Sequence, residues 1–198
     1  MNNLNVISQL HKSTYHLVIV GIYLCFCVYF FFSTETYSLY YTFPNNNLLL
    51  IVIISIFAFL NLFFIQKLLH FGTLGVNRLN LSQFVFIIVY ATILIGIPEE
   101  IIFRGYVHSL LSPLLSNSSI VVLLSSLVFG LAHILNEARS LYPRDWNWKL
   151  VTLSFIAGLY LGTLYELTQS LLVPTILHAF MVLALKVFIK RKSLLEIN

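Results

Sequence analysis

The sequence predicts an all-α fold, a polytopic membrane helix bundle of about six transmembrane helices. Only 9% of its 198 residues are charged, whereas a soluble domain carries about 25%. Hydrophobic residues make up 59% of the chain and are gathered in blocks that approach the ~20 residues a membrane-spanning helix needs. The basic residues, in addition, lie in alternate connections between these blocks. A chain of this composition cannot cover itself with polar surface, so lipid is its expected solvent.

Six apolar blocks account for the predicted spans, taken in order along the chain. They cover residues 17–32, 48–65, 84–97, 119–135, 151–167 and 171–189. Each is rich in Leu, Ile, Val or Phe, and several are near the lower limit of spanning length, so they need flanking residues to cross a bilayer. The first block is followed by Ser33-Thr34-Glu35-Thr36 rather than by a small-residue cleavage site, so we expect it to be a retained anchor.

The charge pattern predicts how these spans are oriented. Of the eleven Lys and Arg residues, all except Arg104 lie before the first block, between the second and third, between the fourth and fifth, or at and after the end of the sixth. Placing these four regions in the cytoplasm satisfies the positive-inside rule, with both termini inside and an even number of spans. The net charge of +4 therefore reflects membrane orientation, and no nucleic-acid partner is expected.

The chain divides into two parts of different character. Residues 1–80 contain two predicted spans and no pair of residues that suggests chemistry, whereas residues 81–198 hold nearly every polar group expected at membrane depth. Ionisable groups inside spans normally face the bundle interior or a wet cavity. We therefore expect residues 1–80 to be a pair of spans without a motif and residues 81–198 to be the functional helix bundle.

The most unusual feature is a charged cluster, Glu99, Glu100 and Arg104, in an apolar setting. A carboxylate at bilayer depth costs roughly 2.5–3.5 kcal/mol on insertion scales, so such a cluster indicates function. Glu100 and Arg104 are four residues apart, on one face of a helix, and are predicted to pair. Glu99 is rotated by ~100° and lacks that partner, which makes it the candidate general base for water. A purely structural Glu–Arg bridge between helices is the alternative, and it leaves Glu99 unexplained.

Two histidines in later spans complete the candidate site. His133 ends an otherwise apolar span, and His178 lies four residues after Pro174, which removes a backbone donor and loosens its helix. Either histidine alone is well explained as an interhelical hydrogen-bond donor. Together with Glu99 they predict one site built from three spans. His108 is a weaker candidate.

Two chemistries use a carboxylate with two histidines. The first is a metal site in which Glu and His ligands hold zinc and activate water, although the chain has no His-Glu-x-x-His motif. The second is metal-free: Glu99 and one histidine deprotonate water, while the other histidine donates to the oxyanion. The residues by themselves leave both chemistries open.

The motifs Glu-Glu-x-x-x-Arg, Phe-x-x-x-His and Ser-Leu-x-x-Pro-x-x-x-His follow one another on successive apolar segments. In this order they resemble the CAAX-protease and bacteriocin-processing (CPBP or Abi) family of intramembrane proteases, over roughly residues 82–190. The resemblance implies peptide-bond hydrolysis in or near the membrane, with Glu99 activating water with help from His133. It also implies that Glu100 and Arg104 shape the site, and that His178 stabilises the oxyanion. Members of this family are described both as metalloproteases and as metal-independent glutamate proteases. Because Glu99 has no built-in partner and the chain has no compact ligand motif, we expect a metal-independent glutamate protease without a cofactor, with a divalent metal such as zinc as the alternative.

One departure from the family pattern and one question of depth bear on this assignment. The last family motif often continues His-x-x-x-Asn, whereas the fourth residue after His178 is Val182. Valine cannot donate to an oxyanion, and loss of such a donor costs on the order of 3 kcal/mol of transition-state stabilisation. In the six-span topology Glu99 and His178 lie toward the outer ends of their spans, with His133 roughly 10 Å deeper. The three would then meet only if the connection 112–119 dips into the bilayer.

The favoured function is an intramembrane endopeptidase that cleaves a membrane-anchored peptide or protein precursor, such as a bacteriocin or signal-peptide precursor or a surface-protein sorting tail. A non-catalytic bacteriocin-immunity or binding protein is the alternative that Val182 supports, and a small transporter using Glu99 is a third. The expected partners are the substrate and the lipid bilayer. The Asn-, Ile-, Phe- and Leu-rich composition suggests a bacterial plasma-membrane protein, for which a prenylated CAAX substrate is not expected.

Overall fold

The computed structural model describes residues 48–68, 73–74, 79–134 and 146–190. The regular structure of this part is helical apart from one short strand pair, so the predicted all-α class is confirmed. Its elements are α3 (Leu48–Leu68), β1 (Thr73–Leu74), α4 (Leu81–Val89), η1 (Tyr90–Gly96), α5 (Ile97–Glu100), η2 (Ile101–His108), α6 (Ser109–Leu111), α7 (Ser118–Ala132), α8 (Trp148–Thr168), α9 (Leu172–Phe188) and β2 (Ile189–Lys190). The strands β1 and β2 pair antiparallel over two residues each.

Two of the described helical stretches are long and apolar enough to cross a membrane, Leu81–Leu111 and Trp148–Thr168. They contain the predicted blocks 84–97 and 151–167. The helices α3, α7 and α9 coincide with three further predicted blocks but do not meet the same criterion over their described residues. The first predicted block, 17–32, lies outside the described residues, so the count of six spans stays a prediction.

The stretch Leu81–Leu111, which we call the long helix, runs without a break through α4, η1, α5, η2 and α6 over 31 residues. The predicted block 84–97 therefore ended too early. Pro98 lacks a backbone N–H, and the hydrogen-bond pattern changes beside it: the Ile97 N–H bonds the Thr92 carbonyl, five residues back. Wider π-helical turns, η1 and η2, flank the α-helical turn that holds Pro98. Such turns occur often at functional sites.

The ends of the helices follow from local sequence. Asn80 begins the long helix with a reciprocal capping box, in which the Asn80 and Gln83 side chains accept each other's backbone N–H groups. Asn117 and Asn147 cap α7 and α8 by accepting a backbone N–H from the first turn. Gln169 ends α8 in the left-handed conformation, with φ of 50°.

Helices α7 and α8 pack closely because small residues face each other at their interface. A Cβ atom on Gly130 would lie 2.9 Å from the Phe155 Cβ, and a Cβ on Gly158 would lie 3.1 Å from the Ser126 Cβ. A Cβ on Gly162, one turn beyond Gly158, would lie 3.2 Å from the Val122 Cγ1. Small residues four apart on both helices let the backbones approach as membrane helices commonly do. This packing brings the middle of α8 up to the site described below.

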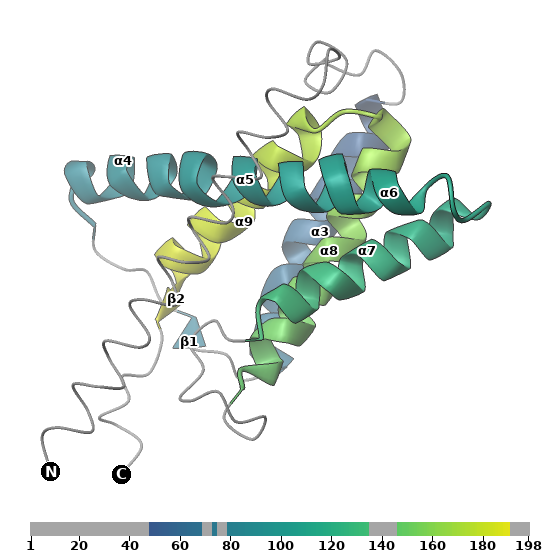
Figure 1. Cartoon of the computed structure of the whole chain (residues 1–198). Coiled ribbons are helices and arrows are strands. Elements are labelled where there is room, and N and C mark those ends of the chain that lie inside the picture. Colours follow the sequence, from purple (N-terminus) through teal and green to yellow (C-terminus); the bar gives the residue numbers. More distant parts are fainter. Residues whose placement is uncertain (1–47, 69–72, 75–78, 135–145, 191–198) are drawn as a thin grey trace, which may run out of the picture.

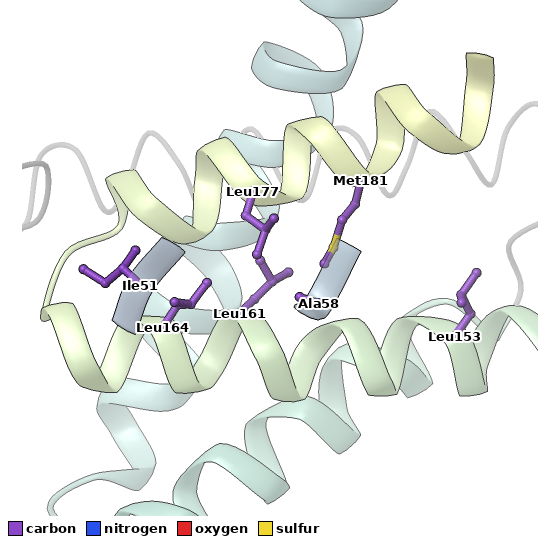
Figure 2. Close-up of a cluster of buried hydrophobic side chains, with 7 residues drawn as sticks. All are labelled: Ile51, Ala58, Leu153, Leu161, Leu164, Leu177 and Met181. Carbon is purple, nitrogen blue, oxygen red and sulfur yellow. The ribbon is translucent and has the colours of Figure 1, made fainter. Parts of the chain in front are cut away.

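A second face of α8 contributes to the main apolar core, with residues of α3 and α9 (Figure 2). The buried members of this core are Ile51, Ala58, Leu153, Leu161, Leu164, Leu177 and Met181. The long helix crosses this arrangement and contacts α7, α8 and α9 (Figure 1). Its first nine residues, α4, bury no side chain. The buried charged and polar side chains of the long helix therefore lie in α5 and η2, after its first nine residues.

Candidate active site

The long helix supplies three buried charged residues, Glu99 and Glu100 from α5 and Arg104 from η2. Arg104 Nη1 donates to Glu100 Oε1 at 3.0 Å, so the predicted i, i+4 pair is confirmed. Arg104 Nη2 donates to the Gly158 carbonyl at 3.0 Å, and the guanidinium carbon lies 4.7 Å from the centre of the Phe129 ring. Both partners of the ion pair are at most 1% exposed. The pair thus joins the long helix to α7 and α8.

His178 on α9 is oriented by Glu100. Its Nδ1 lies 2.8 Å from Glu100 Oε1, the same oxygen that accepts from Arg104. An ionised carboxylate can only accept hydrogen bonds, so His178 carries its proton on Nδ1 when the ring is neutral. Its Nε2 then presents a lone pair, and it lies 3.7 Å from Glu99 Oε2.

His133, at the C-terminal end of α7, approaches Glu99 in the same way. Its Nδ1 lies 2.9 Å from the Phe129 carbonyl, which can only accept, so the neutral ring again presents a lone pair at Nε2. This Nε2 lies 3.7 Å from Glu99 Oε2. The Phe129 ring packs edge-on against both imidazoles. Three hydrogen-bond acceptors from three helices therefore converge, and both Nε2 atoms lie too far from Glu99 Oε2 for a direct hydrogen bond.

All five residues predicted for the site, Glu99, Glu100, Arg104, His133 and His178, are thus brought together. The expected offset of His133 by roughly 10 Å is wrong, since His133 and His178 are equally far from Glu99. The reason is that the long helix continues past Pro98, which places Glu99 near its middle rather than at its end. No dip of the connection 112–119 is required.

The site lies near the middle of both candidate spans. The carbonyl bonded to Arg104 belongs to Gly158, which is halfway along Trp148–Thr168. At 1.5 Å per residue, Gly158 is ~15 Å from either end of α8. Glu99 lies just past the midpoint of Leu81–Leu111. If these helices cross the bilayer, the charged groups lie close to its centre, where they require the internal partners described above.

A second polar network, centred on His108, connects the long helix to α7 and α8 one turn beyond Arg104. His108 Nε2 lies 2.8 Å from Glu166 Oε1 on α8, and its Nδ1 lies 3.3 Å from Ser125 Oγ on α7. The Tyr165 ring packs edge-on against the imidazole. His108 was only a weak candidate from the sequence, and Glu166 was missed. An acidic residue inside an otherwise apolar block was the signal that could have identified it.

Four buried side-chain atoms have no hydrogen-bond partner within the described residues: Glu99 Oε2, Glu100 Oε2, Arg104 Nε and Thr175 Oγ1. Three belong to residues predicted from the sequence, and Thr175 was missed. Buried polar atoms are rarely left unpaired, so this set suggests groups that bind water or substrate. Across the described part of the chain, no three His, Cys, Asp or Glu side chains are placed as ligands of a metal ion.

Replacing Gly158 with Ala is expected to lower the free energy of unfolding by about 1–3 kcal/mol, as overpacking of a tight interface does. The added Cβ would lie 3.1 Å from both Phe129 Cδ1 and Ser126 Cβ, so α8 must move away from α7 and carry the carbonyl bonded to Arg104 with it. Thermal unfolding in detergent measures the change. Thr152→Ala, at an exposed position of α8, is the matched control, and equal stability of the two variants would contradict the expectation.

Replacing Glu166 with Gln is expected to destabilise the protein by about 1–3 kcal/mol, because a charge-assisted hydrogen bond to buried His108 becomes a neutral one. A double-mutant cycle with His108→Gln tests whether the effect comes from this contact. Non-additive unfolding free energies are expected, whereas additive values would show that the two residues act independently.

Comparison with known proteins identifies the family. The family model described as type II CAAX prenyl endopeptidase Rce1-like matches residues 81–184, just over half of the chain. No curated protein and no solved structure matches the chain. The matched segment begins at the first residue of the long helix, ends within α9 and includes all five residues of the converging cluster. Membership of a protease family, together with the apolar helices, makes this an integral membrane protein whose substrate is a protein or peptide in a membrane. The chain therefore belongs to the Rce1-like family of CAAX-type intramembrane proteases.

Proposed function

We propose that this protein is an endopeptidase that hydrolyses a peptide bond of a membrane-anchored peptide or protein precursor with water activated by Glu99 and His133. The observation that carries the proposal is the position of Glu99 Oε2, buried, without a hydrogen-bond partner among the described residues, and 3.7 Å from the Nε2 atoms of both His133 and His178. A water molecule has two protons to donate and can satisfy two of the three converging acceptors, Glu99 Oε2 and His133 Nε2.

In this proposal the water donates to Glu99 and to His133, and its remaining lone pair attacks the carbonyl carbon of the scissile bond. As the carbon–oxygen bond forms, Glu99 takes a proton from the water. The carbonyl oxygen becomes an oxyanion. When the carbon–nitrogen bond breaks, Glu99 returns the proton to the leaving amine, which regenerates the carboxylate. General acid–base catalysis of this kind contributes typically 10²–10⁴-fold to a rate.

Glu100 and Arg104 have a supporting role in this mechanism. Glu100 Oε1 accepts hydrogen bonds from Arg104 and His178, so it fixes the orientation of the imidazole ring. A carboxylate behind a catalytic histidine acts in the same way in serine proteases. In its protonated form, His178 would direct an Nε2–H toward the site and stabilise the oxyanion. Its neutral form has no proton at that position.

We propose that this chemistry needs no metal ion, because Glu99 and His133 can together orient and deprotonate a water molecule. We further propose that residues 81–198 form the catalytic bundle, that residues 1–80 add two spans, and that the protein resides in a bacterial plasma membrane with both termini in the cytoplasm. The substrates we favour are bacteriocin or signal-peptide precursors and surface-protein sorting tails.

The test uses purified protein in detergent, wild type beside Glu99→Ala, with a library of membrane-anchored peptides that includes prenylated CAAX peptides. New termini are identified by mass spectrometry, with and without a chelator. Cleavage by the wild type alone supports the proposal, and its survival in chelator supports the metal-free form. Cleavage lost in chelator would overturn the metal-free form only. A folded wild type that cleaves nothing would overturn the peptidase and favour a binding or immunity protein.

A further inference from the structure

Thr175 on α9 carries a hydroxyl group that the mechanism above does not use. The residue is 4% exposed, and Oγ1 has no hydrogen-bond partner among the described residues. A threonine inside a helix usually bonds the carbonyl four residues back, as Thr163 and Thr168 on α8 do. The Leu171 carbonyl, four residues before Thr175, accepts a hydrogen bond from the Thr175 backbone N–H and not from its hydroxyl. A buried, unpaired hydroxyl is costly, so its retention requires an explanation.

The position of Thr175 places it beside the catalytic cluster. It precedes His178 by three residues, and residues three apart share a face of an α-helix. That face packs against the long helix: the Thr175 carbonyl lies 3.4 Å from where a Gly96 Cβ would be, and Ala179 lies 3.7 Å from the same point. Gly96 is in turn one helical turn before Glu99 and Glu100. Thr175 and His178 of α9 therefore lie against consecutive turns of the long helix.

The three groups that converge at Glu99 Oε2, unlike the more distant Arg104 guanidinium, lack the kind of group that Thr175 supplies. Glu99 can only accept while ionised, and the neutral forms of His133 and His178 have lone pairs, not protons, at Nε2, because their Nδ1 atoms donate elsewhere. Val182, one turn beyond His178, has no donor at all. A substrate carbonyl that turns into an oxyanion nevertheless needs a donor from the first moment of attack. Thr175 has a hydroxyl proton that is not committed to another described group.

We propose that Thr175 is a further catalytic residue, whose hydroxyl donates a hydrogen bond to the carbonyl oxygen of the scissile peptide bond and to the oxyanion formed from it. This inference rests on the proposed peptidase function. No bond to Thr175 is made or broken: the hydroxyl keeps its proton, and the hydrogen bond strengthens as negative charge develops on the oxygen. In its protonated form, His178 would add a second donor, an Nε2–H.

The test compares Thr175→Val with Thr175→Ser, on the peptide that the wild-type protein cleaves. Valine keeps the shape of the side chain and removes the hydroxyl, so kcat is expected to fall on the order of 10²-fold, as on loss of one oxyanion donor. Removing an unsatisfied buried hydroxyl should at the same time leave the unfolding temperature unchanged or raise it. Serine keeps the donor and should retain most of the activity. A purely structural role would instead lower stability and activity together.

Thr163→Val is the matched control, because its hydroxyl is half-buried on α8 and already bonded to the Leu159 carbonyl. It should leave kcat close to the wild-type value. Thr175→Val that cleaves at the wild-type rate would overturn this inference and leave the proposed function standing. Loss of activity in Thr175→Ser equal to that in Thr175→Val would also overturn it, since the hydroxyl would then not be the relevant group. A folded wild type that cleaves no peptide would overturn both proposals.

Discussion

Replacing Glu99 with Gln is expected to slow peptide cleavage by about 10²–10⁴-fold, the range of a lost general base, and to leave the protein folded. Glutamine has nearly the same shape but cannot take a proton from water. The folded state should tolerate the change, because Glu99 Oε2 makes no hydrogen bond to any described residue and because a neutral amide is cheaper to bury than a carboxylate. Cleavage rates and thermal unfolding in detergent, measured on the same preparation, separate the two effects.

Glu99→Asp is the control that keeps the carboxylate and withdraws it from the two histidines. It should retain more activity than Glu99→Gln, because the base is present but displaced from the position that the proposed mechanism gives it beside the attacking water. A Glu99→Gln protein that cleaves at near the wild-type rate would remove Glu99 from the mechanism and reduce it to a packing role.

Replacing Arg104 with Met is expected to destabilise the protein by about 3–5 kcal/mol, the cost of leaving one partner of a buried ion pair without its counter-charge. The Glu100 side chain is fully buried and would keep only the bond from His178. The hydrogen bond to the Gly158 carbonyl and the contact of the guanidinium with the Phe129 ring would also be lost. Since domains are stable by only about 5–15 kcal/mol, the Arg104→Met protein should lose a large fraction of its stability in detergent.

The double variant Glu100→Gln with Arg104→Met tests this explanation. It removes the orphaned charge and should recover part of the lost stability, whereas independent effects would add. Lys149→Met removes an exposed positive charge at the start of α8 and is the matched control, with an expected change within about 0.5 kcal/mol. An Arg104→Met protein as stable as Lys149→Met would show that the buried pair does not support the fold.

The helical class and the Glu100–Arg104 pair were predictable from the sequence because both depend on local spacing. Apolar blocks with few charges predict helices in lipid, and residues four apart meet on one face of any helix. His133 and His178 could be predicted as site residues because ionisable groups are rare at membrane depth. Each of these inferences uses composition or periodicity within a single element, which the sequence contains in full.

The relative depths of the site residues were not predictable in the same way. Counting residues from the presumed ends of spans placed His133 away from Glu99, because a block that ends before Pro98 was expected to end its helix there. The structure continues the helix through wider turns on both sides of Pro98. The long helix packs against α7, α8 and α9, and its contact with α9 includes a close approach at Gly96.

The amino-acid sequence alone specifies which residues carry the charge and that helices present them, since helix formation and the i, i+4 pairing are local. What each polar atom faces depends instead on how the helices pack. The tertiary structure assigns the Nδ1 atoms of His133 and His178 to a carbonyl and to Glu100, turns both Nε2 atoms toward Glu99, and adds Glu166 and Thr175 to the buried polar groups. These relations join residues from different helices, and their geometry depends on how the helices cross, which no pattern within one helix specifies.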